Sequence, residues 1–275
     1  DFGIMGARPA HPALLDWLAV EFMDAKWNAR HITKLIVTSA AYRQSAVVSA
    51  EKLERDPANR LISRGPRLRL DGEVIRDMAL AVSGLLVPDI GGPPVKPYQP
   101  EGIWEAVAMK ESNTRFYKQD SGNALYRRSL YTFWKRTAPP PSMEILNAPS
   151  REVVCTRRDA TNTPLQALVT LNDPQFVEAS RQLATAAIKA GGEPSARLDH
   201  ITRRLLGRTL ADAERAIVMQ SHERTHGAFT ADPEAAKALL AVGATPADAS
   251  IPVDDLAAWT LTASQILNLD EALTR

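Results

Sequence analysis

Cysteine is almost absent from this sequence, since Cys155 is the single one among 275 residues. One cysteine excludes an internal disulfide, a Cys-x-x-Cys-His heme attachment motif and a multi-cysteine zinc site within the chain. Long hydrophobic runs are also missing, because no apolar stretch reaches the roughly 18 residues that a membrane-spanning helix requires. We therefore expect no membrane span in these residues.

Net charge is nearly absent as well, because 33 basic and 32 acidic side chains leave a total of +1. This balance argues against a general nucleic-acid binder, so no nucleic-acid partner is expected. The content of 45% hydrophobic and 24% charged residues is that of an ordinary globular protein. The sequence begins at Asp1 without a basic and apolar leader, so any targeting signal is expected outside it.

The near-zero total hides two blocks of opposite charge. Residues 110–158 carry ten basic and four acidic side chains, whereas residues 209–275 carry four basic and ten acidic ones. Blocks of opposite sign can pair with each other inside a fold. One interpretation of the basic block is therefore internal pairing with acidic C-terminal helices.

Apolar residues recur at three- and four-residue steps over most of the sequence, which predicts amphipathic helices. Leu14, Trp17, Leu18 and Phe22 show this spacing after Pro12. The same spacing occurs in segments 32–39, 75–86, 198–206, 210–217 and 256–267.

Two further helix starts are indicated by capping residues. Thr163 precedes Pro164, and Gln166 stands at the third helical position, as in a capping box. Asp173 and Pro174 repeat the order of cap and proline. Capping explains these residue types, so we interpret both motifs as structural.

Between residues 88 and 158 the helical spacing disappears and prolines cluster. Segment 130–134, Leu-Tyr-Thr-Phe-Trp, has the aromatic and β-branched composition of a buried strand, which could pair with segment 103–109. The sequence thus predicts a mainly α, irregular helical domain with a small β-sheet in its proline-rich middle. Its parts are N-terminal helices at 1–87, an irregular basic middle at 88–158 and C-terminal helices at 159–275.

Several segments together resemble a known family, a planctomycete-specific C-terminal domain of unknown function. The resemblance covers nearly the whole chain. The segments that carry it are His11–Ala19 (HPALLDWLA), Ile36–Ser45 (IVTSAAYRQS), Tyr126–Thr137 (YRRSLYTFWKRT), Thr161–Leu168 (TNTPLQAL) and Leu171–Pro174 (LNDP).

The resemblance implies a large exported protein with several domains. Such proteins often carry an N-terminal signal, a cytochrome c module and a second planctomycete-specific module, so heme c is expected only in an upstream domain, with no cofactor in this chain. The resemblance also implies a periplasmic or cell-surface location, other domains of the same polypeptide as partners, and first helices of the domain that precede Asp1. It implies no reaction, because the family's biochemical role is not established.

The candidate ligand-binding site is a cluster of basic and aromatic residues in the middle of the chain. Arginine forks can grip carboxylates or phosphates, which makes heme propionates or an anionic polysaccharide suitable partners. The alternative is that the arginines pair internally while the aromatic rings fill the core. The cluster consists of Arg127, Arg128, Tyr131, Trp134, Lys135, Arg136, Arg151, Arg157 and Arg158.

The motif His222-Glu223-Arg224-Thr225-His226 matches the zincin pattern, in which two histidines one turn apart bind zinc. We reject a zinc site here because Arg224 places a charge at a normally uncharged position and Gly227 is expected to end the helix. No metal site is therefore predicted. Cys155 has basic neighbours but no identifiable histidine partner, so we do not expect it to act as a nucleophile.

The leading hypothesis is a structural or interaction module rather than an enzyme, because no convincing catalytic set is recognisable. One alternative is a polysaccharide hydrolase that uses a pair of carboxylates about 5 to 10 Å apart. Another is carbohydrate binding through exposed Trp27 or Trp104. The candidate carboxylates are Glu101, Glu105, Glu144 and Glu152.

Overall fold

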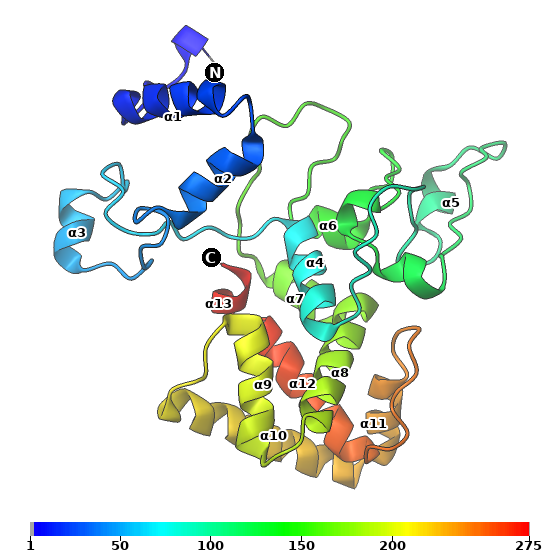
Figure 1. Cartoon of the computed structure of the whole chain (residues 1–275). Coiled ribbons are helices and arrows are strands. Elements are labelled where there is room, and N and C mark those ends of the chain that lie inside the picture. The colour runs from blue at the N-terminus through cyan, green and yellow to red at the C-terminus, as the bar shows by residue number, and fades with distance from the viewer. Residues whose placement is uncertain (1–2, 275) are drawn as a thin grey trace. The chain divides into compact units, whose positions relative to one another are not determined.

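The computed structural model describes residues 3–274 and is mainly helical, as the sequence predicts (Figure 1). The chain forms two compact units that divide between Leu68 and Arg69. The division falls inside the segment 1–87, so the last helix of that segment belongs to the second unit. Within residues 3–274, no helix combines the length and apolar character needed to cross a bilayer.

The N-terminal unit, residues 3–68, is built from two packed helices and shorter turns. The predicted spacing after Pro12 is confirmed as a helix, and α1 packs against α2. Asn28 caps α2 because its side-chain oxygen accepts hydrogen bonds from the backbone N–H groups of Arg30 and His31. The elements are η1 (Gly3–Met5), α1 (Pro12–Asp24), α2 (Ala29–Thr38) and α3 (Ala50–Arg55).

The C-terminal unit, residues 69–274, is a helical bundle preceded by an irregular segment. Thr163 and Asp173 cap α7 and α8, and a proline follows each cap, as predicted. Its elements are α4 (Gly72–Ser83), α5 (Ile103–Val107), η2 (Gly122–Tyr126), η3 (Ser129–Tyr131), α6 (Pro141–Ile145), α7 (Pro164–Asn172), α8 (Pro174–Lys189), α9 (Pro194–Leu206), α10 (Asp212–Ala231), α11 (Pro233–Leu240), α12 (Val253–Leu267) and α13 (Asp270–Leu273).

The core of this bundle is centred on α12, which α8, α9, α10 and α11 surround (Figure 1). Trp259 of α12 is completely buried, together with Ala257 and Ala263 on the same helix. Leu183 of α8 and Ile201 of α9 belong to the same apolar cluster. Burial of these side chains supplies the main driving force for folding of the bundle.

The predicted small β-sheet is wrong within the described residues. Most of segment 103–109 forms helix α5 (Ile103–Val107) instead of a strand. The helix starts directly after Gly102, whose backbone has a left-handed conformation (φ 80°). Segment 130–134 makes a single parallel bridge, in which Val95 bonds both Tyr131 and Phe133 at 2.7 Å. A ladder cannot continue from Val95, because the prolines on both sides of it lack the N–H donors that a sheet requires.

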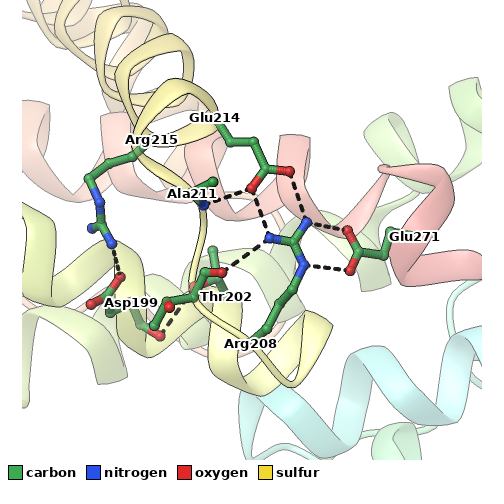
Figure 2. Close-up of polar contacts among 8 residues, drawn as sticks. Asp199, Thr202, Arg208, Ala211, Glu214, Arg215 and Glu271 are labelled. Atoms are coloured by element: carbon green, nitrogen blue, oxygen red, sulfur yellow. Dashed lines mark hydrogen bonds and ion pairs between the residues drawn. The ribbon is translucent and has the colours of Figure 1, made fainter. Parts of the chain in front are cut away.

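Helix α13 is held to the bundle by an arginine clamp, which consists of Arg208, Glu214 and Glu271. The Arg208 guanidinium lies between the carboxylates of Glu214 and Glu271 and donates two hydrogen bonds to each, at 2.7 to 2.9 Å (Figure 2). The Glu214 carboxylate also fixes the start of α10, because it accepts a hydrogen bond from the Ala211 N–H at 2.8 Å. The clamp thus ties α10 and α13 to the turn after α9.

We expect the Arg208→Leu variant to unfold a few degrees below the unchanged protein at neutral pH. The clamp lowers the pKa of Glu214 from 4.5 to about 2. A lowered carboxyl pKa stabilises the fold above pH 4.5, and that stabilisation is lost as the pH falls toward 2. Thermal unfolding of both proteins across this range should show that the difference between their unfolding temperatures becomes smaller as the pH falls.

The matched control is Arg224→Leu, which removes the same charge from an exposed position on α10. This control should unfold close to the unchanged protein at every pH. A difference for Arg208→Leu that stays constant from neutral pH to pH 2 would contradict a role for the Glu214 carboxylate.

Candidate functional site

Arg127 anchors the centre of the predicted basic and aromatic cluster. Its guanidinium is buried, and it donates hydrogen bonds to the backbone oxygens of Pro93 (3.0 Å), Asp89 (3.2 Å) and Gly91. The same group lies 3.9 Å from the ring centre of Tyr131. Arg127 therefore shapes the loop at residues 89–93 and has little of its fork left for a ligand.

Tyr131 and Trp134 are held at their polar ends by backbone groups. The Tyr131 hydroxyl accepts a hydrogen bond from the Gly91 N–H at 2.7 Å, and the Trp134 indole N–H donates to the Ser150 oxygen at 2.7 Å. Arg151 stacks on the Trp134 ring at 4.6 Å from its centre. These bonds fix both rings and bring the loop around residue 150 beside segment 131–134.

A groove of about 520 Å³ lies between these segments. We call it the basic–aromatic groove. Both arginines that line it, Arg136 and Arg151, are exposed and make no hydrogen bond or ion pair with other residues of 3–274, so their donors are free to bind a ligand. The groove is lined by Gly92, Pro94, Leu130, Tyr131, Thr132, Phe133, Trp134, Arg136 and Arg151.

The backbone of Arg151 is itself unusual, because its φ of 62° lies in the left-handed region. A residue with a side chain adopts this conformation at a cost of about 1–2 kcal/mol. Strain of this kind persists only where surrounding contacts enforce it. Here the bond from Trp134 to the Ser150 oxygen and the stacking of Arg151 on the same ring hold the turn in place.

The other members of the predicted cluster lie outside the groove. Arg128 and Arg157 are exposed, and Lys135 donates to a backbone oxygen at 2.9 Å. Arg158 pairs with Glu73 of α4 at 2.7 Å, and this hydrogen bond raises the pKa of Arg158. The structure therefore brings four of the nine residues, Tyr131, Trp134, Arg136 and Arg151, to one groove and places five elsewhere.

Several acidic residues of the C-terminal helices pair with basic residues of the same helical bundle. Asp255 pairs with Arg197 at 3.1 Å, and Glu214 and Glu271 pair with Arg208. These partners lie outside the basic block at 110–158. The two exposed arginines of the groove thus keep their charge unpaired within residues 3–274.

Comparison with known families gives one match. The family model described as PSD1, a protein of unknown function (DUF1553), covers residues 1–222 of the 275. The chain belongs to this family. No curated protein and no solved structure matches the chain.

The PSD1 match contains the whole basic–aromatic groove and ends at His222, in the middle of α10. It leaves Glu223 and His226 of the zincin-like motif outside.

The zincin-like motif lies within an unbroken helix. Gly227 does not end the helix, contrary to our expectation, because α10 continues to Ala231. His222 is buried, its ring lies tilted against Trp259 with 4.1 Å between the ring centres, and it forms a hydrogen bond with the Thr262 hydroxyl at 3.0 Å.

His226 faces a different partner, the carboxylate of Asp254 at 3.6 Å. Burial lowers the pKa of His222, which keeps its imidazole neutral at physiological pH. Within residues 3–274, no three His, Cys, Asp or Glu side chains gather as metal ligands would. The motif thus contributes to packing between α10 and α12.

The residues named for polysaccharide chemistry are dispersed. Trp104 is 1% exposed and packs against Tyr117 and Phe133, so the expectation of an exposed Trp104 is wrong, whereas Trp27 is 68% exposed in the N-terminal unit. Cys155 is exposed, and its thiol donates to the Arg157 oxygen at 3.2 Å. None of the four candidate carboxylates, Glu101, Glu105, Glu144 and Glu152, lines the basic–aromatic groove.

Proposed function

We propose that this PSD1-family chain is a non-catalytic interaction module that binds a carboxylate-bearing ligand in the basic–aromatic groove. One observation carries the proposal: Arg136 and Arg151 extend unpaired guanidinium groups along a groove whose aromatic rings are fixed by backbone bonds. Guanidinium forks bind carboxylates with two parallel hydrogen bonds, and such charge-assisted bonds are stronger than neutral ones.

An anionic polysaccharide suits this groove best. A uronic acid chain repeats at each sugar a carboxylate and a ring face of C–H groups, which matches arginine forks beside Tyr131 and Trp134. Heme propionates offer the same carboxylate chemistry. A polysaccharide differs from them by spanning the groove with several sugars.

We further propose that the chain is part of an exported protein at the periplasm or cell surface, next to a cytochrome c module. This proposal is supported by the resemblance of the quoted segments alone. The chain itself holds one cysteine, so a c-type heme would be attached to another segment of the polypeptide. A full-length gene without a leader and without a Cys-x-x-Cys-His segment upstream would contradict both parts.

We expect Arg136→Ala and Arg151→Ala each to weaken binding of trigalacturonic acid by about tenfold. Each variant loses a charge-assisted hydrogen bond worth about 1.5 kcal/mol. Isothermal titration calorimetry at low and high salt measures the effect. Binding to the unchanged protein should weaken with salt, because screening reduces charge attraction.

The matched control is Arg157→Ala, which removes an exposed charge outside the groove and should leave the affinity near that of the unchanged protein. Maltotriose, a neutral sugar, tests whether charge matters. A separate titration with free heme distinguishes propionates from uronic acids. Equal binding of maltotriose and trigalacturonic acid, or no response to either groove variant, would reject the proposal.

A further inference from the structure

A second cavity in the C-terminal unit has the opposite chemical character. It has a volume of about 530 Å³ and lies where α6, α7 and the first turn of α8 meet the loop around residues 98–100. This size falls within the range of about 300–1,000 Å³ that is typical of ligand pockets. None of its lining residues belongs to the basic–aromatic groove, so the two sites are separate.

The walls of this cavity are mainly aliphatic. Leu165 and Leu168 stand three positions apart on α7 and so share one helix face, and Ile145 of α6 lines the cavity with them. Leu165 is 60% exposed and Leu168 is 54% exposed. Large aliphatic side chains that are exposed together at a cavity are typical of a surface that binds a ligand or a partner.

The polar groups of the cavity are three amides, the hydroxyl groups of Tyr98 and Ser142, and one carboxyl group. Gln99, Gln119 and Asn172 line it together with Asp173, and no lysine, arginine or histidine does. The Asp173 carboxylate already accepts a hydrogen bond from the Gln175 N–H at 3.1 Å. Burial raises the pKa of this Asp173 carboxyl group above its ordinary value, and the nearby Arg76 cation opposes that shift. The cavity therefore carries little net charge and has no group that would bind an anion.

We propose that this cavity binds an uncharged peptide segment that carries an aliphatic side chain. Leucine and isoleucine walls match an aliphatic side chain and do not match a ring covered with hydroxyl groups. Each amide side chain has both a donor and an acceptor, as a peptide group does, so the exposed Gln119 can pair with a peptide backbone. The Asn172 side chain keeps its oxygen for the same purpose, since its nitrogen already donates to the Leu168 oxygen at 2.8 Å. The single aromatic lining residue, Tyr98, is already held by Glu178 at 2.8 Å.

The test uses a pool of acetylated and amidated tripeptides built from leucine, isoleucine, valine, proline and serine. Ligand-observed NMR with the full chain should detect binding from this pool. Affinity of the best tripeptide should change little between about 0.05 and 0.5 M salt, since screening acts on charges. Leu168→Arg should weaken it by about tenfold or more, because a charge at the rim would have to lose water on binding.

Leu171→Arg is the matched control, since Leu171 is on the same helix, is 37% exposed and does not line the cavity. Leu168→Ser provides a second, milder variant that should also weaken binding, and thermal unfolding verifies that each variant is folded. The Arg136→Ala variant should bind the best tripeptide as the unchanged protein does, which would show that the cavity and the basic–aromatic groove are separate sites. Absence of binding from the whole pool, equal losses in Leu168→Arg and Leu171→Arg, or preference for cellotetraose over every tripeptide would overturn the proposal.

Discussion

Replacing Arg76 with methionine is expected to lower the free energy of unfolding of the C-terminal unit by about 3–5 kcal/mol, the cost of breaking a buried charged network. Arg76 is 1% exposed and lies on α4. Methionine fills a similar space but has no donors. The variant therefore removes the hydrogen bonds while it keeps most of the packing.

The size of the effect follows from what Arg76 holds together. Its guanidinium donates to the backbone oxygens of Leu125 and Arg127, both at 2.8 Å, and to the Gln175 side chain at 2.6 Å. It thereby joins α4, the loop before the basic–aromatic groove and α8. Each acceptor left buried without a partner costs about 1–3 kcal/mol.

Urea unfolding followed by circular dichroism measures the loss. Arg203→Met is the matched control because Arg203 is an exposed arginine on α9, and it should change the free energy of unfolding by no more than about 0.5 kcal/mol. Arg76→Met should also weaken trigalacturonic acid binding, since the Arg127 backbone is one of its acceptors. A loss similar to that of the control would show that the network contributes little to stability.

Helices and their starts could be predicted because their signals are local. Thr163 and Asp173 cap their helices through bonds to residues two or three positions ahead, so the residue types alone reveal them. The spacing of apolar residues identifies α4, α9 and α12 for the same reason. Packing against the core only strengthens what these segments already favour.

Two predictions failed where distant contacts or one residue decided the outcome. Segment 103–109 was expected to be a strand, but Trp104 is buried as part of the short helix α5 against Tyr117 and Phe133. Gly227 was expected to end α10, yet a glycine inside a helix costs only about 1 kcal/mol relative to alanine. α10 packs against α12, and the helix continues through Gly227 to Ala231.

The candidate site was predictable as a region but not as a geometry. Charge and aromatic content identify segment 127–158, because both are visible in the sequence. They do not show that Arg127 turns inward to the carbonyls of residues 89–93 or that Arg158 pairs with Glu73. The sequence features that could have indicated this geometry are Gly91 and the prolines at 93 and 94, which predict a turn. The Arg127 side chain donates to the backbone of that turn, and the turn forms one wall of the groove.

Ending the chain at His222, where the PSD1 match stops, is expected to abolish the cooperative unfolding of the C-terminal unit. The shortened chain would lack α11, α12 and α13 and the second half of α10. Trp259 on α12 is completely buried, and α12 packs against α8 at the centre of the bundle. Removing it exposes the apolar faces of α8 and α9 to water, which costs about 25 cal/mol for each Å² exposed.

Thermal unfolding followed by circular dichroism, together with hydrogen exchange, compares this chain with one that ends at Leu273. The control retains all the helices and the bond from the Leu70 N–H to the Leu273 oxygen at 2.9 Å, so it should unfold in one cooperative transition. The chain ending at His222 should show no cooperative transition of the C-terminal unit and little exchange protection in α8. Protected α8 amides in that chain would mean that the residues covered by the PSD1 match fold without α12, and the bundle core would then have to be assigned to α4, α8 and α9 alone.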